Sequence, residues 1–174
     1  MPNQLNNNTM RLLFLLVFFI PLIVCAQKDE SFVKFINEDG SVIRGSSVTK
    51  LYERQIPVFN LETNSSAYST IVRFTLGTES AAGILRNLLQ TNKKMRSGEI
   101  AVTYTNYDRR QVRFKINMEN IAVEECTDAN GTTTVQLHAT RIGWTYYSYT
   151  KSGVQSISSK SGWDEEKRRA WTNF

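Results

Sequence analysis

The sequence predicts a mainly β protein that has one α-helix and whose strands are long and bent enough to curl into a barrel. Three observations support this fold class. Apolar and polar residues alternate through most of the chain, as they do in half-buried strands. Apolar residues at helical spacing form one clear stretch before the tail, around residues 79–93. The alternation in the last long strand slips by one residue, which indicates a bend in a curved sheet.

The first third of the chain contains three predicted strands, at residues 31–36, 55–62 and 69–76. An Asp-Gly pair within residues 38–41 is typical of the tight turn after the first strand. The second strand contains Pro57, which has no backbone N–H to donate to a sheet. We therefore expect this strand at a sheet edge or at a bulge.

Residues 79–93 form the one predicted helix. Its apolar stripe is expected to face the core and consists of Ala81, Ile84, Leu85, Leu88 and Leu89. Thr78 is the expected N-cap, because its hydroxyl can accept a hydrogen bond from a free N–H of the first turn. Lys93 and Lys94 suit the negative end of the helix dipole.

Alternation returns after the helix. Residues 99–105 and 111–118 read as a hairpin joined by residues 106–110, and residues 132–150 follow a turn at 128–131. Within that last strand the apolar phase changes after Ala139, so we expect a bulge between Thr140 and Gly143. This phase places Ile142, Trp144 and Tyr146 inside, and Tyr147 and Tyr149 in an outer aromatic stripe. Residues 151–162, rich in Ser, Gly and Lys, read as a loop.

The N-terminus has the pattern of a signal peptide: Arg11, an apolar run at residues 12–24, and small residues after it. The run is shorter than the roughly 20 residues of a spanning helix, so we expect no stable membrane anchor. Val24 and Ala26 suit cleavage after Ala26. The expected organisation is a signal peptide at 1–26 and one domain at 27–174, secreted or periplasmic. A start at Met10 and a short uncleaved anchor are the alternatives.

Charge and cysteine content limit the classes of function. The net charge is +5 and falls to +4 if the signal peptide, whose only charge is Arg11, is removed. Basic clusters are separated by acids, so the sequence lacks the contiguous basic face of nucleic-acid binding proteins. Without Cys25, Cys126 has no partner for an intramolecular disulfide, and the two preceding glutamates disfavour its thiolate.

Catalytic and metal-binding patterns are missing from the sequence. His138 is the one histidine and lies in the middle of a predicted strand, where we expect it to face solvent or an interface. No metal-ligand spacing or phosphate-binding loop occurs, so no metal or cofactor is expected. The neighbouring acids at 124–125 and 165–166 are expected to be solvated charges.

The end of the sequence resembles a known family. The last long strand carries an I-x-W-x-Y pattern, and a variable segment then leads to a Gly-Trp-Asp element. This arrangement resembles the haemolysin-coregulated protein (Hcp) family, the tube proteins of type VI secretion systems. The matching residues are Ile142, Trp144, Tyr146, Gly162, Trp163 and Asp164. The resemblance extends in element order over residues 32–171.

This resemblance implies a small antiparallel Hcp-like β-barrel of two packed sheets with one helix, six copies of which form a ring. It implies no enzyme activity, and secreted effectors or other secretion proteins as partners. Trp163 is then expected to pack on the barrel as a plug, and Asp164 to fix the turn of the tail. Tyr147, Tyr149 and the strand carrying Pro57 are the expected subunit contacts.

Two features differ from the family pattern. Tube proteins of this family usually have no signal peptide, so an exported copy indicates a different use of the fold. The family's long loop corresponds here to the short segment 63–69, which predicts weak stacking of rings. The alternatives are an exported monomeric β-barrel that binds a ligand or envelope component, and a hydrolase that uses His138 or the acidic pairs.

Overall fold

The computed structural model describes residues 29–63, 70–106 and 108–174. It contains nine strands and one helix in these ranges. The strands are β1 (Glu30–Asn37), β2 (Val42–Ile43), β3 (Ile56–Thr63), β4 (Ile71–Gly77), β5 (Met95–Asn106), β6 (Arg109–Ala129), β7 (Thr132–Tyr149), β8 (Gln155–Asp164) and β9 (Arg169–Ala170); the helix is α2 (Ser80–Thr91). The predicted signal peptide and most of the 63–69 segment lie outside the described residues.

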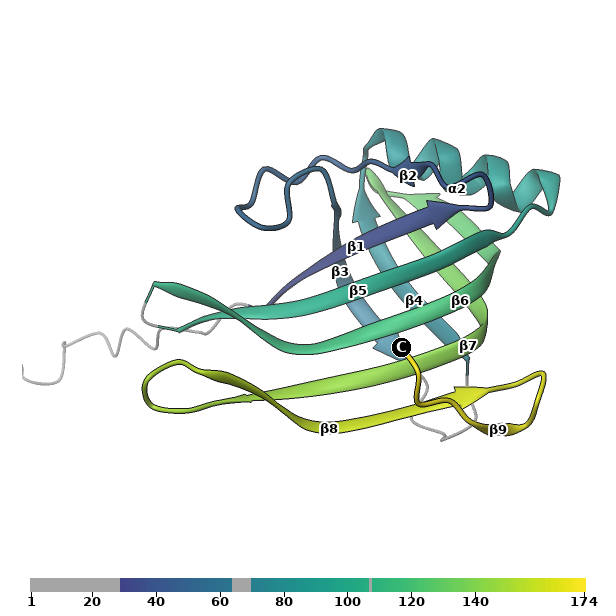
Figure 1. Cartoon of the computed structure of the whole chain (residues 1–174). Helices are drawn as coiled ribbons and strands as arrows, with labels where there is room; N and C mark the ends of the chain where they lie inside the picture. Colours follow the sequence, from purple (N-terminus) through teal and green to yellow (C-terminus); the bar gives the residue numbers. More distant parts are fainter. Residues whose placement is uncertain (1–28, 64–69, 107) are drawn as a thin grey trace, which may run out of the picture.

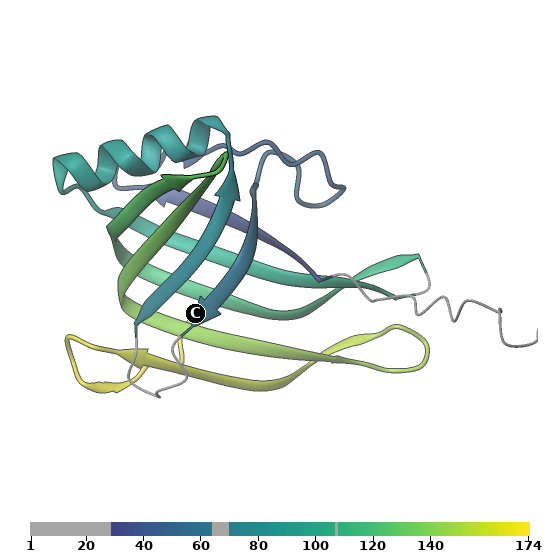
Figure 2. The same ribbon diagram turned by 180° about the vertical axis from the view of Figure 1, so that it is seen from behind.

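Six strands form a closed antiparallel barrel in the order β4-β3-β1-β5-β6-β7, and the pairing of β4 with β7 completes the ring of strands. The predicted fold class is therefore confirmed. Figures 1 and 2 show α2 lying across one end of this barrel, whereas the hairpins β5–β6 and β7–β8 extend beyond it in the other direction. The core consists of the inward side chains of the barrel strands and includes the stacked pair Phe35 and Phe74.

The strand that carries Pro57 is not at an edge, contrary to the sequence-based prediction. β3 pairs with β4 on one side and with β1 on the other, where Pro57 lies opposite Phe32. The irregularity lies farther along the strand, where Asn60 has a φ of 48° and the register with β4 shifts between Phe59 and Glu62. The expected edge is therefore absent, because β1 and β4 cover both sides of β3; a role of this strand in subunit contacts stays a prediction.

The helix is confirmed, but two of its details differ from prediction. Glu79 occupies the N-cap position without a capping side-chain bond, because the Thr78 hydroxyl donates instead to the carbonyl of Gly131, 2.8 Å away. Ile84 is 39% exposed, and Ala82 takes its place on the buried face. The helix ends at Asn92, whose left-handed conformation lets its N–H reach carbonyls of the last turn.

The phase slip in β7 is present, but no bulge in the β6–β7 ladder causes it. Glu119 pairs with Arg141 and Ile121 with Ala139, so the register is continuous across the slip. Both strands change the face that they direct toward the core at the same point. Asn120 of β6 has a φ of 51° there, and its side-chain amide donates to the Thr140 hydroxyl of β7 at 2.7 Å. At this point β7 also changes its second neighbour, from β4 to β8.

Candidate functional site

The predicted loop at 151–162 is largely a strand. β8 pairs with β7 from Gln155 to Asp164 and continues the barrel wall beyond the end of β4. Alternation failed to reveal it because its residues 155–161 are all exposed, so no buried face gives a period of two. Barrel pairing and not burial therefore holds this segment in place.

The structure distributes the Gly-Trp-Asp residues over different environments. Trp163 lies opposite Ile142 and is half-buried, and its role as a plug on the barrel stays a prediction. Trp144 is also half-buried and packs against the core. Asp164 is 3% exposed and is the most buried member of the element.

Asp164 organises the turn between β8 and β9. Its carboxylate accepts hydrogen bonds from the backbone N–H of Lys167 at 3.0 Å and from the Arg141 guanidinium at 2.9 Å. The same guanidinium donates to Glu119 on β6 at 2.7 Å, so one arginine connects three strands. The bond from Lys167, and after it the bond from Arg141, lowers the pKa of Asp164 below its ordinary value of 3.8.

This lowered pKa gives a pH-dependent contribution to stability. Because the folded protein prefers the ionised carboxylate, Asp164 stabilises the fold above pH 3.8 and loses that contribution as the pH falls through its folded pKa. We expect Asp164→Asn to have a lower melting temperature than wild type at pH 6. At pH 3 the difference in melting temperature between the two proteins should be smaller. Thermal melts from pH 3 to 7 would measure this. A constant difference across that range would contradict the role.

The aromatic residues at positions 171 and 174 pack against two paired glycines. Gly143 on β7 lies opposite Gly162 on β8. A Cβ atom at Gly143 would lie 2.4 Å from the Phe174 ring, and one at Gly162 would lie 2.5 Å from the Trp171 carbonyl oxygen. Side chains at these positions would therefore occupy the space of the tail. The predicted bend at Gly143 is, in the structure, a site of close packing.

Three contacts hold Phe174 against Gly143 and Gly162. The ring of Trp171 packs on it with centroids 4.7 Å apart, and the Lys160 Nζ lies 4.2 Å from its ring centroid. Lys160 also donates to the Phe174 carbonyl oxygen at 2.6 Å. Sequence reasoning missed Phe174 because its partners are 3 to 31 residues away in the chain; the glycine pair was the one available signal.

The expected outer stripe of Tyr147 and Tyr149 is not a free surface. Both residues are half-buried, and the Tyr149 hydroxyl accepts from the Val112 N–H at 2.8 Å and donates to the Val112 carbonyl at 3.1 Å. Burial raises the pKa of this hydroxyl. Tyr146, which was expected inside, is instead 41% exposed. The reason is that β7 runs past the barrel here, so its inner face meets no opposite wall (Figure 1).

The outer edge of β8 is the clearest candidate assembly surface. β9 pairs with β8 only at Trp163 and Asp164, and the Trp171 N–H donates to the Gly162 carbonyl, so among the described residues the edge from Gln155 to Ser159 has no strand beside it. Ile157 is 61% exposed on this edge, and Lys160 is the one charged residue of β8 before Asp164. Such an edge presents backbone N–H and C=O groups to another strand.

The described residues show no catalytic arrangement around His138. Its Nε2 lies 2.7 Å from a carboxylate oxygen of Glu165, and the Thr70 hydroxyl donates to the same carboxylate at 3.3 Å. This cluster connects the tail turn to the barrel. The described part of the chain also contains no group of three or more metal-ligating side chains, and no helix in it is long and apolar enough to cross a membrane.

Cys126 is half-buried beside the helix, with its sulfur 4.0 Å from the Ala82 carbonyl oxygen. Burial raises the pKa of its thiol, so the reactive thiolate is disfavoured at neutral pH.

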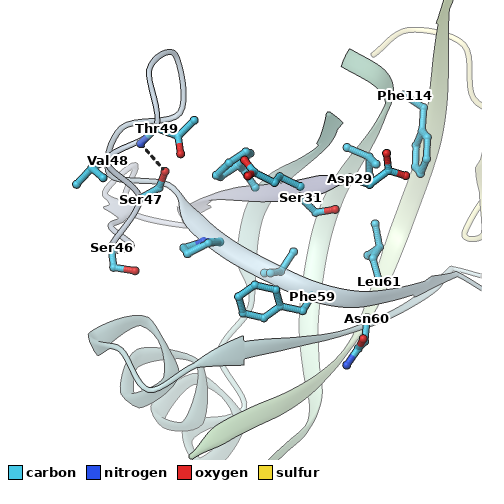
Figure 3. A pocket seen from close by; sticks show the side chains of 15 residues that line it. Asp29, Ser31, Ser46, Ser47, Val48, Thr49, Phe59, Asn60, Leu61 and Phe114 are labelled. Atoms are coloured by element: carbon cyan, nitrogen blue, oxygen red, sulfur yellow. Dashed lines mark hydrogen bonds between the residues drawn. The ribbon is translucent and has the colours of Figure 1, made fainter. Parts of the chain in front are cut away.

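A cleft of about 690 Å³ lies between the start of β1, the second half of β3 and the loop at residues 46–49. Figure 3 shows that Phe59 and Leu61 of β3 form one side, while Asp29, Ser31 and Phe114 lie on the other. The cleft exists because β3 continues to Thr63 whereas its pairing with β1 stops at Val58 and Ser31. The cleft could not be predicted from local sequence patterns, because its walls come from separate strands.

No protein-family model matches the sequence, and no curated protein matches it. Solved structures do match. The chain aligns with Hcp1 from Salmonella typhimurium at a TM-score of 0.66 and 17% identity, covering 82% of this chain and 99% of that one. A protein described as a type six secretion system protein aligns at 0.68 and 14% identity, covering 83% and 100%. Hcp3 from Pseudomonas aeruginosa aligns at 0.59 and 16%, covering 76% and 98%. At these identities the likeness shows a shared fold, and it confirms the fold that the resemblance implied.

Proposed function

We propose that this chain is an exported structural protein that assembles into Hcp-like rings and binds protein partners. The single observation that carries the proposal is the completeness of the fold match: the chain covers 99% of Hcp1 and 100% of the type six secretion system protein. A whole subunit fold, and not an isolated hairpin, is therefore present. The exported state rests on the predicted signal peptide at residues 1–26.

The β8 edge supports the assembly part of the proposal. A ring needs two different surfaces on each subunit, so that each copy contacts the next in the same way. The edge from Gln155 to Ser159 offers one such surface, because a neighbour's strand can pair with its backbone. Tyr146 and Ile157, exposed close to it, add apolar area that a partner would bury.

The ring encloses a channel in this proposal, and secreted effectors or other secretion proteins are the partners that would occupy it. The stacking of rings into tubes stays a prediction tied to the 63–69 segment, most of which lies outside the described residues. The β-barrel itself is the proposed working part, and the lack of enzyme activity stays an expectation from the resemblance.

The mass of the fragment 27–174 in solution tests ring formation. This fragment keeps the whole buried core, which runs from Phe32 to Asp164. Size exclusion with light scattering is expected to give six times the subunit mass at micromolar concentrations. A mass of one subunit at every concentration would contradict the ring and leave the monomeric alternative.

A further inference from the structure

The residues that line the cleft between β1, β3 and the loop at 46–49 differ in charge from the chain as a whole. The sequence has 21 Lys and Arg residues against 16 Asp and Glu residues. The cleft lining nevertheless contains two acids, Asp29 and Glu30, and no basic residue. A cavity with acidic walls in a basic protein favours a positively charged occupant.

The two carboxylates keep exposed surface for such an occupant. Asp29 pairs with Arg113 at 2.9 Å and Glu30 pairs with Arg110, but neither arginine belongs to the lining of the cleft. The side chains of Asp29 and Glu30 are 40% and 38% exposed. A carboxylate can accept several hydrogen bonds, so one arginine does not exhaust either group.

The remaining wall is mainly apolar. It is formed by Phe32, Val48, Pro57, Val58, Phe59, Leu61, Val102 and Phe114. Phe59 is 53% exposed and lies on the β3 side of the cleft in Figure 3. Its ring face is available to a cation, whereas the ring of Phe32 already has the Arg110 guanidinium over it, 5.6 Å from its centroid.

Serine and threonine side chains surround the loop side of the opening. Ser46, Ser47 and Thr49 line it there, and the Ser47 hydroxyl accepts from the Thr49 N–H at 3.2 Å, the bond drawn in Figure 3. These hydroxyls can accept N–H donors of a charged head group. The volume of about 690 Å³ lies within the usual range for small-molecule sites.

We propose that this cleft binds an amphiphilic organic cation, with its ammonium head beside Asp29 and Glu30 and its apolar body against Phe59 and Leu61. The acids supply charge complementarity, and the Phe59 ring adds a cation–π contact. The apolar walls remove the body from water. A regular peptide strand is a poorer fit, because the left-handed Asn60 and the register shift interrupt the β3 edge.

Calorimetric titration of the 27–174 fragment tests this site with two matched probes, decylammonium and decyl sulfate, each below its micelle-forming concentration. We expect the ammonium probe to bind at one per subunit and the sulfate probe to bind at least about tenfold more weakly. In the double variant Asp29→Asn/Glu30→Gln, the ratio of the affinities for the ammonium and sulfate probes should fall to near one. Phe59→Ser should weaken both probes, because it removes apolar wall.

The matched control is Glu124→Gln/Glu125→Gln. It also neutralises two adjacent acids, one of which pairs with an arginine, here Arg73 at 3.6 Å. This variant should bind the ammonium probe like wild type. Equal binding of both probes by wild type, several probe molecules per subunit, or an equal loss in the control would each overturn the proposal. The result is independent of ring formation, since binding is measured per subunit.

Discussion

Adding one methyl group at Gly143 is expected to expel the Phe174 ring and to destabilise the fold by about 1–3 kcal/mol, as overpacking does elsewhere. The new Cβ would lie 2.4 Å from two ring carbons of Phe174, closer than any real contact. We expect the protein to relax by moving the ring away, which loses the contacts of Phe174 with Trp171 and Lys160. Chemical denaturation of Gly143→Ala would measure the loss.

The cause can be isolated with a double-mutant cycle. If the damage is the expulsion of Phe174, then Gly143→Ala should cost little in a Phe174→Ala background, giving strong non-additivity. Gly77→Ala is the matched control, because a Cβ there meets nothing within 4 Å. Additive losses would show that Gly143 is needed for another reason, such as its own backbone conformation.

Placing lysines on the β8 edge is expected to abolish ring assembly while leaving the barrel folded. Ile157→Lys/Ser159→Lys adds two positive charges beside Lys160, and natural proteins use edge lysines to prevent strand pairing between molecules. Both side chains are exposed, so the subunit itself should keep its melting temperature within a few degrees. Light scattering should then report the mass of a single subunit.

The control for this variant places the same two charges on the exposed face of α2. Ile84→Lys/Asn87→Lys again replaces one apolar and one polar residue. Ile84 is 39% exposed, and Asn87 is also exposed. It should leave the mass of the assembly unchanged. An unchanged mass in the β8 variant, or dissociation of both variants, would show that subunits do not meet through the β8 edge.

Much of the secondary structure followed from local patterns. Apolar patterning identified β1, β3, β4, β5 and β7 to within a few residues, because one face of each strand is buried in the barrel. Turn chemistry was equally local: Gly40, Asn130 and Gly131 have the positive φ values that their turns require. The helix emerged from its spacing, apart from the cap, where a hydrogen bond to a distant carbonyl decided which residue serves.

The failures share one cause, which is that each depended on a partner far away in the chain. β8 has no buried face of its own and exists through its pairing with β7. Pro57 was placed at an edge because nothing in its own segment shows that β1 and β4 cover both sides of β3. Tyr146 and Tyr149 exchanged their expected environments because the far end of β7 lies outside the closed barrel.

By itself the sequence determined the fold class, the helix and the resemblance at the C-terminus, because periodicity and turn residues act over a few positions. The tertiary structure decided what is free to bind. Pairing of β3 with both β1 and β4 removed the expected edge, β8 was left with a free one, and the extension of β3 beyond the start of β1 opened the cleft. These features come from which strands end first, and strand ends are set by pairing between distant segments.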